Sequence, residues 1–299
     1  MAGIPFDTEF EFEYGKCDQL SPLIRRVIAN NPSPFTFTGT GTYIIGTGKV
    51  AVIDPGPLLD AHVDAILAAL GPDESVSHIV VTHTHLDHSP ACTPLQARTG
   101  APIYSFSPPD PEAFDGPRLE EDADDDFKPD NIVAHGDLIE GDNWTLECVF
   151  TPGHMANHMC YALREEKALF TGDHVMGWST TVIAPPDGNM KNYMASLDLL
   201  LARDDVVYWP THGTRIQDPQ NFVRAYIAHR RGREAQIIAR LEAGDDHIRQ
   251  MVATMYVDVD KRLHPAAALS VFAHIQDLLE RGIIHCATAP SLDARYQLV

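Results

Sequence analysis

The chain has 299 residues, of which 44% are hydrophobic and 21% charged, and its formal net charge is -20 at pH 7. This length is enough for a buried core and roughly two domains, and the composition is that of an ordinary globular protein. The strong negative charge disfavours long polyanions such as nucleic acids as partners, although it does not exclude them.

The N-terminal segment lacks the basic stretch and apolar run of a signal peptide, and no apolar stretch approaches the length of a membrane span. The five cysteines are scattered and odd in number, with no Cys-x-x-Cys pair, which favours reduced thiols over a disulfide framework. We therefore expect a cytoplasmic protein that does not enter a membrane.

In the first part of the chain, apolar residues occur at strand spacing and at helical spacing in turn. They predict strands over residues 35–46, 49–54, 77–82 and 102–105, and helices over 58–70 and 91–99. A Gly-bearing turn between the first two strands predicts a hairpin. Residues 107–130 are rich in Pro and Asp and include the acidic run 120–126, so we expect an exposed loop with a solvated acidic face rather than a calcium loop.

Strands resume over residues 144–151, 158–163 and 168–171. After residue 212 the pattern changes to helices, over residues 217 to about 241, 246–256 and 266–281, followed by a short strand over 282–285. Strands mixed with helices indicate the α/β class. We expect a metal-binding catalytic domain over residues 1–215, a long linking helix over 216–244 and a small winged-helix-like domain over 245–299.

The acidic excess lies in the first of these parts. Residues 1–214 hold 11 Lys and Arg against 32 Asp and Glu, whereas residues 215–299 hold 11 against 10. Bound divalent cations would offset some of this negative charge locally.

Four side chains of metal-binding type follow the strand predicted over residues 77–82: His83, His85, Asp87 and His88. Imidazole and carboxylate are the ligands that zinc and similar divalent ions prefer. His83 and His85 alternate on an extended segment, so their imidazoles point to the same side and can bind one ion together. Asp87 and His88 come after a turn and suit a second ion nearby.

Three more candidate ligands each follow a predicted strand and a tight turn or a Gly: His154 in Thr-Pro-Gly-His, Asp173 in Thr-Gly-Asp, and His212 in Pro-Thr-His-Gly. Ligands from separate segments that gather on loops at strand ends are typical of a site that a rigid sheet presents. The total exceeds the four ligands of one structural zinc, which favours a catalytic centre with two ions.

The order His-x-His-x-Asp-His, Pro-Gly-His, Gly-Asp and His-Gly, with Val52-Ile-Asp54-Pro-Gly upstream, resembles the metallo-β-lactamase superfamily over residues 35–213. The resemblance implies an αββα sandwich of two sheets flanked by helices. Residues 192–197, 226–230 and the helical tail resemble the β-lactamase-like protein 2 group, whose animal members are described as endoribonucleases acting on single-stranded RNA.

The resemblance implies that one metal ion is bound by His83, His85 and His154. It assigns Asp87, His88 and His212 to a second ion, places Asp173 as a bridge between the two, and gives Asp54 the role of orienting a ligand or its loop. The ions are expected to be Zn2+, with Mn2+ or Fe2+ as alternatives.

Two such ions would share a bridging hydroxide that attacks a carbonyl or phosphoryl centre, while they polarise the electrophile. Asp87 would accept the hydroxide proton as well as bind metal. Two positions depart from the superfamily pattern: Ser89-Pro90 stand where Gly-Gly is common, and Thr211 stands where Gly usually precedes the last ligand. Neither departure removes a ligand, but both bear on the shape of the pocket.

Four functions stay open at this point. The first is a hydrolase of a small-molecule ester, thioester, lactone or amide, which the charge favours. The second is an endoribonuclease or phosphodiesterase acting on single-stranded RNA, for which arginines of the long helix would hold phosphate: Arg224, Arg230, Arg231 and Arg233. A winged-helix binding module is disfavoured because residues 266–280 contain no Lys or Arg. A mononuclear iron oxygenase is disfavoured because the full set of ligands for a second ion is present.

The helical tail is expected to pack against the catalytic domain or to form a homodimer contact. His158 and His174 flank the ligands, and a structural role is favoured for both, although His174 could contact substrate. Asn192, Trp178 and Tyr193 either line a pocket or pack in the core.

Overall fold

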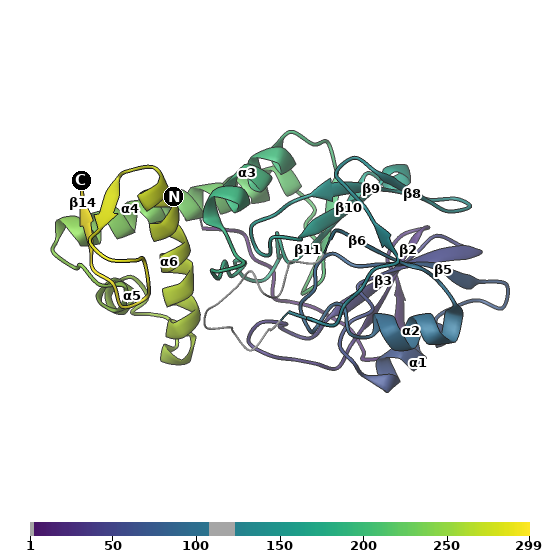
Figure 1. Cartoon of the computed structure of the whole chain (residues 1–299). Helices are drawn as coiled ribbons and strands as arrows, with labels where there is room; N and C mark the ends of the chain where they lie inside the picture. The colour runs from purple at the N-terminus through teal and green to yellow at the C-terminus, as the bar shows by residue number, and fades with distance from the viewer. Residues whose placement is uncertain (1–2, 108–122) are drawn as a thin grey trace.

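The computed structural model describes residues 3–107 and 123–299, and its centre is a pair of β-sheets (Figure 1). Within these residues the first sheet has seven strands in chain order, antiparallel from β1 to β4 and parallel from β4 to β7. Its strands are β1 (Cys17–Gln19), β2 (Ile24–Ile28), β3 (Gly41–Ile45), β4 (Lys49–Ile53), β5 (Ser75–Val80), β6 (Ile103–Ser105) and β7 (Asn131–Ile132).

The second sheet has five strands in the described residues, in the order β12-β11-β10-β9-β8. Its strands are antiparallel except for the parallel pair of β11 and β12. The strands are β8 (Leu138–Glu140), β9 (Thr145–Phe150), β10 (Met159–Leu163), β11 (Ala168–Gly172) and β12 (Val207–Pro210).

Helices cover the outer faces of both sheets, which produces four layers. On the first sheet, α1 (Asp60–Ala68) and α2 (Cys92–Thr99) share one apolar cluster with β2 to β6. On the second sheet, α3 (Met190–Leu201) and the first half of α4 (Pro219–Glu242) share another with β9 to β12. A third apolar cluster lies between the sheets. The expected α/β class and αββα sandwich are confirmed.

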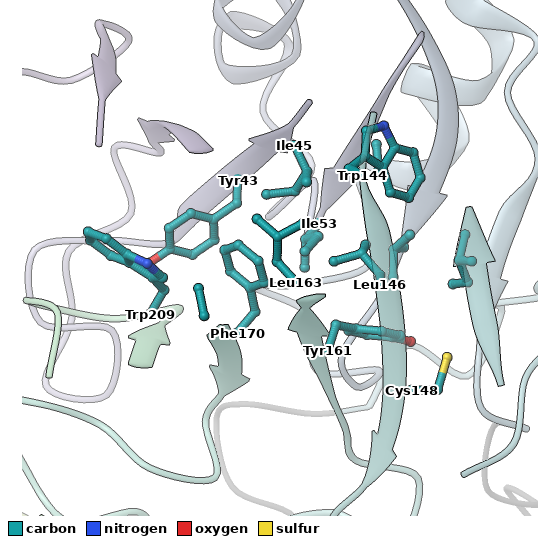
Figure 2. Close-up of a cluster of buried hydrophobic side chains, with 14 of the residues drawn as sticks. Tyr43, Ile45, Ile53, Trp144, Leu146, Cys148, Tyr161, Leu163, Phe170 and Trp209 are labelled. Carbon is teal, nitrogen blue, oxygen red and sulfur yellow. The ribbon is translucent and has the colours of Figure 1, made fainter. Parts of the chain in front are cut away.

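The core between the sheets follows from alternation along buried strands. On β3, Tyr43 and Ile45 face the second sheet while Ile44 faces α1 and α2. Figure 2 shows Tyr43 beside Phe170 of β11, with ring centroids 4.9 Å apart. The Tyr43 hydroxyl donates a hydrogen bond of 2.6 Å to the Pro210 carbonyl, so this large side chain is buried without an unpaired hydroxyl.

The C-terminal part forms a core of its own at one end of the molecule (Figure 1). It contains α5 (Ile248–Met255), α6 (His264–Glu280), the short 3-10 helix η3 (Lys261–Leu263), and the hairpin of β13 (Ile284–Cys286) and β14 (Tyr296–Leu298). The second half of α4 contributes Ile237 to this core. In the other direction, Ala273 of α6 reaches the cluster of α3 and α4. The tail therefore packs against the sandwich, which is one of the two arrangements expected for it.

One predicted strand differs from the structure, and one predicted loop lies mostly beyond what the structure describes. The strand predicted over residues 35–46 is confined to β3, because Phe37 and Gly39 adopt positive φ angles of 56° and 126° and turn the chain. The predicted acidic loop over residues 107–130 lies mostly outside the described residues. Its described end, residues 123–130, has Asp124 joined to Ser89 by a hydrogen bond of 2.8 Å.

Two further findings concern the cysteines and the helices. All five cysteines are free thiols. Among the described helices, none combines the length and the apolar character needed to span a bilayer.

The three-part division of the chain into residues 1–215, 216–244 and 245–299 stays a proposal, because α4 contributes to two cores.

A pair of leucine substitutions tests the core between the sheets. Leu146 is fully buried there, whereas the side chain of Leu58 is 66% exposed. Leu146→Ala should lower the free energy of unfolding by about 2–5 kcal/mol, because it removes buried apolar atoms and leaves a cavity. The matched Leu58→Ala change should stay within about 0.5 kcal/mol. Denaturant titration of both variants measures the difference, and equal effects would contradict the assigned core.

Candidate metal centre

The seven predicted ligands lie at one edge of the sandwich, where strands of both sheets end. His83, His85, Asp87 and His88 follow β5. The other three follow three strands of the second sheet: His154 follows β9, Asp173 follows β11 and His212 follows β12. Because the two sheets face each other, loops from distant parts of the sequence meet at this edge.

The first group consists of His83, His85 and His154, whose nearest ring nitrogens all lie within 4.8 Å of one another. His83 Nε2 is 2.9 Å from His85 Nδ1, and His154 Nε2 is 3.2 Å from the same atom. Three imidazole nitrogens that converge in this way can bind one divalent cation.

The second group consists of Asp87, His88 and His212. Oδ2 of Asp87 lies 3.1 Å from His212 Nε2 and 3.5 Å from His88 Nε2. Asp173 also reaches this group, with Oδ2 3.4 Å from His212 Nε2 and Oδ1 3.7 Å from His88 Nε2. It forms a third group with His83 and His88, so its carboxylate lies beside both sets of ligands.

Several of these atoms are buried without a hydrogen-bond partner, although they approach one another closely. They are both carboxylate oxygens of Asp87, Oδ1 of Asp173, and Nε2 of His88 and His212. Buried polar atoms are normally hydrogen-bonded, because burial without a partner costs free energy. Atoms of this kind that converge from four side chains fit the coordination of cations, and the set matches nitrogen and oxygen ligands for zinc.

The remaining ring nitrogens orient the imidazoles. Nδ1 of His83 is 3.0 Å from the Thr82 hydroxyl, and Nδ1 of His88 is 2.9 Å from Asp54 Oδ2. Nδ1 of His154 and Nδ1 of His212 face backbone carbonyls, at 2.7 Å and 3.2 Å respectively, from Val182 and Gly39. Each contact leaves Nε2 directed at the centre, which is the usual way in which a protein sets the orientation of a metal-binding histidine.

Asp54 joins three of the loops at this edge. Its carboxylate accepts hydrogen bonds from the Thr82 amide and hydroxyl, both at 2.8 Å, and from the Thr211 hydroxyl at 2.9 Å, in addition to its contact with His88. Asp54 itself has a positive φ of 48°, which turns the chain immediately after β4.

The two departures from the superfamily pattern both add hydrogen bonds. The Thr211 hydroxyl belongs to the Asp54 network, which Gly at that position could not join. The Ser89 hydroxyl donates to Asp124 and so holds the described end of the acidic segment against the ligand loop.

The electrostatics differ between the two groups. Burial, followed by the neighbouring imidazoles of His88 and His85, lowers the pKa of His83 well below its usual range. Burial likewise lowers the pKa of His85 to about 3 and lowers the pKa of His154. These three imidazoles are therefore neutral at pH 7, which is the form that binds metal.

In the second group the carboxylates raise the pKa values of the imidazoles instead of leaving them lowered by burial. Burial opposes protonation of His88 and His212, but Asp87 and Asp173 outweigh burial for both residues. They raise the pKa of His88 well above its usual range and that of His212 to about 10. The imidazoles of His88 and His212 in turn outweigh the effect of burial on the two carboxylates. The pKa of Asp87 therefore falls to about 2, and the pKa of Asp173 falls well below its usual range. The metal-free site thus holds protonated imidazoles against ionised carboxylates.

The other residues named from the sequence are buried in the packing, line a hollow or are exposed. His158 is buried, with Nδ1 2.9 Å from the Thr151 hydroxyl and Nε2 accepting from the Asp173 amide, so it holds the backbone of Asp173 in place. His174 is buried against the Tyr193 ring, and Tyr193 belongs to the apolar cluster of α3 and α4. Trp178 lines a hollow beside the metal centre, whereas Asn192 is exposed on α3.

The four candidate phosphate-binding arginines, Arg224, Arg230, Arg231 and Arg233, do not share a face of α4. Arg224 and Arg231 are exposed, and Arg233 lies over the Tyr256 ring in the C-terminal core. Arg230 is buried and donates to the Thr181 carbonyl on the loop that follows Asp173. The row of phosphate-binding arginines that the second function would use is therefore not assembled by these four described residues.

Apart from Asp54, sequence reasoning missed the groups that orient the ligands. Thr82 directly precedes His83, so its position beside the ligand run was an available signal. The carbonyls of Val182 and Gly39 have no side-chain signature, because any residue supplies a carbonyl.

The chain matches the metallo-beta-lactamase superfamily over residues 36–212 and the beta-lactamase associated winged helix domain over residues 248–287. The first match covers more than half of the chain, so the chain belongs to the metallo-beta-lactamase superfamily and is a metal-dependent hydrolase of that class. The resemblance predicted from the motifs and the winged-helix tail are both confirmed.

Among curated proteins, the chain is 31% identical to the beta-lactamase-like protein 2 homolog of Caenorhabditis elegans, over 89% of this chain and 88% of that protein. It is 30% identical to the atrochrysone carboxyl ACP thioesterase dmxR1 of Cryptosporiopsis sp., over 81% of this chain and 74% of that protein. A beta-lactamase domain protein from Burkholderia ambifaria superposes with a TM-score of 0.77 at 17% identity, covering 98% of this chain and 97% of that structure, which shows the shared fold.

Asp54→Asn tests the orienting network. Asn tolerates the positive φ at this position but lacks the charge that holds His88 and the two threonine donors. Zinc affinity should fall about 10–100-fold, as expected when a residue that orients a ligand is lost. Competition with a fluorescent chelator measures this, with exposed Asp60→Asn as the control. Unchanged zinc affinity in Asp54→Asn would contradict the role.

Proton release tests the electrostatics. At pH 7 the metal-free protein carries protons on His88 and His212, because their folded-state pKa values lie above 7. Zinc binding requires neutral imidazole, so it should release these protons, and affinity should rise as the pH rises from 7 toward 10. Calorimetry in two buffers of different ionisation enthalpy counts the protons. His212→Gln should release about one proton fewer, and net proton uptake by the wild-type protein would contradict the assignment.

Proposed function

We propose that the chain uses two zinc ions to hydrolyse a small-molecule ester, thioester, lactone or amide. One observation carries this proposal: two three-residue ligand groups, joined by Asp173, lie at one edge of the sandwich beside an open hollow lined by His154 and Asp173. A purely structural metal site would be closed by its ligands.

The proposed ligand sets follow the groups of side chains. His83, His85 and His154 would bind the first ion, and Asp87, His88 and His212 the second, with Asp173 between them. Asp54 would act through His88 by fixing its ring. The unpaired buried atoms of Asp87, His88, Asp173 and His212 support this assignment.

Two bound ions of this kind supply a hydroxide nucleophile at neutral pH and polarise the scissile carbonyl. We assign to Asp87 the acceptance of a proton during the reaction, because its carboxylate is ionised at neutral pH and both its oxygens are buried without hydrogen-bond partners. His154, His83 and His85 stay neutral, which keeps their Nε2 or Nδ1 lone pairs available for the first ion.

Among the four bonds, we favour the thioester. Two relatives named as thioesterases, those of Cryptosporiopsis sp. and Aspergillus fumigatus, are 30% and 31% identical to this chain. The net charge of -20 also favours a small substrate over a long polyanion.

The alternative is an endoribonuclease or phosphodiesterase acting on single-stranded RNA. The likeness to the beta-lactamase-like protein 2 homolog supports it, because that alignment includes the C-terminal part as well as the sandwich. The dispersed arginines of α4 count against it, since Arg230 is buried and Arg233 faces the C-terminal core.

A substrate panel tests the proposal. Zinc-loaded protein is offered acyl thioesters, lactones, penams, phosphodiesters and short single-stranded RNA, with and without a chelator. We expect thioester hydrolysis that the chelator abolishes and added zinc restores, with about two zinc ions per chain by elemental analysis. RNA cleavage without thioester hydrolysis would favour the alternative, and full activity in metal-free protein would refute both.

Ligand variants complete this test. His154→Ala and Asp173→Ala should lower kcat by at least about 100-fold, because each removes a ligand or the bridge. Exposed His285→Ala, in the C-terminal hairpin, is the matched control and should keep wild-type activity. Elemental analysis of the protein as purified, before zinc loading, decides between Zn2+ and the alternatives Mn2+ and Fe2+. The cytoplasmic location and the homodimer stay predictions.

A further inference from the structure

Two neighbouring hollows share a wall at the metal centre. The inner hollow measures about 30 Å³ and is lined by His154 and Asp173 together with Trp178. The outer hollow measures about 430 Å³. Pro34 and Phe35 line both, so the two spaces adjoin at this pair of residues.

Because the two hollows differ in volume, different parts of a substrate would lie in each of them. A space of about 30 Å³ holds one or two water molecules and can take little more than the group being cleaved. The rest of a substrate must therefore lie beyond it. A space of about 430 Å³ falls within the usual range of small-molecule pockets.

Two separate parts of the chain build the outer hollow, and each is held in place. Pro34 and Phe35 sit on a turn in which the Ser33 hydroxyl accepts from the amides of Phe35 and Thr36. The opposite wall is formed by Leu263 of η3 and by Pro265 and Ala266 of α6.

The α6 wall is anchored to the sandwich. Ala273 packs in the cluster of α3 and α4, and Lys191 of α3 forms an ion pair of 3.0 Å with Glu280. A site assembled from such fixed elements keeps its shape.

The lining of the outer hollow is mostly apolar. Its two charged residues, Asp260 and Arg262, are paired with each other, with Arg262 Nη2 2.6 Å from Asp260 Oδ2. The pair leaves no net charge among the residues that line this space. A phosphate backbone would find no unpaired cation there, whereas an uncharged hydrocarbon group would be desolvated on binding.

We propose that the outer hollow is an acyl-binding subsite, and that the C-terminal domain thereby selects substrates with an apolar acyl group of several carbons. The inference rests on the proposed function, because it assigns the scissile carbonyl to the inner hollow. The acyl group would pass Phe35 and lie against Leu263 and Ala266.

The test uses the zinc-loaded full-length protein and N-acetylcysteamine thioesters of acetate and octanoate. Wild type should prefer octanoyl over acetyl in kcat/KM, with a gain of up to about fourfold for each methylene that is buried. Ala266→Trp places an indole in the hollow and should lower this preference at least about tenfold. Leu263→Asn, which keeps the space but makes it polar, should lower it in the same direction.

Ala253→Trp is the matched control, because Ala253 is an exposed alanine on α5 of the same domain and does not line the hollow. It should keep the wild-type preference. An octanoyl preference that survives both Ala266→Trp and Leu263→Asn would overturn the subsite. So would a variant that changes the preference among leaving-group thiols but not among acyl groups, since the hollow would then hold the leaving group.

A binding measurement separates this inference from the proposed function. If the zinc-loaded wild type hydrolyses no thioester, the proposed function fails. Calorimetry with non-hydrolysable 2-oxoalkyl thioethers of increasing chain length then tests the hollow alone. Affinity that grows with chain length in wild type and Ala253→Trp, but not in Ala266→Trp, would keep the subsite. Affinity independent of chain length in wild type would overturn it.

Discussion

The carboxylate of Asp54 is the interaction on which the arrangement of the metal centre depends. It is fully buried and accepts hydrogen bonds from Thr82, from Thr211 and from His88. Its partners lie on loops after β5 and β12, which belong to different sheets. One charge thus ties the two halves of the sandwich together at the edge where the candidate ligands meet, and its burial is compensated by four donors.

A second clamp acts from α4. The Tyr226 hydroxyl accepts from the Met176 amide and lies within hydrogen-bond distance of the Met176 and Ser179 carbonyls, to one of which it can donate. Arg230 donates to the Thr181 carbonyl. These contacts fix the loop that runs from Asp173 to Val182, whose carbonyl orients His154. The helix that connects the two cores therefore also holds one wall of the metal centre. Asp54 thus orients His88, whereas α4 holds the loop whose Val182 carbonyl contacts His154.

Much of the site could be predicted from the sequence, because the candidate ligands are side chains with a distinctive chemistry. Their spacing after strand-like segments also indicated the edge at which they meet. What could not be predicted depends on backbone geometry. The strand over residues 35–46 was predicted too long, since alternation does not reveal the positive φ of Phe37 and Gly39. Helix α3 was missed as an element, although Asn189 caps it and its buried residues have helical spacing.

Helix α4 belongs to two apolar cores, which limits where the chain can be cut without exposing apolar surface. Phe222 and Tyr226 near its start are buried against the second sheet, while Ile237 near its end is buried in the winged-helix core. A cut at either end of the helix would leave an apolar face of one partner in water. A transplanted tail would therefore need the whole helix and a matching sheet surface beneath it to keep both apolar cores covered.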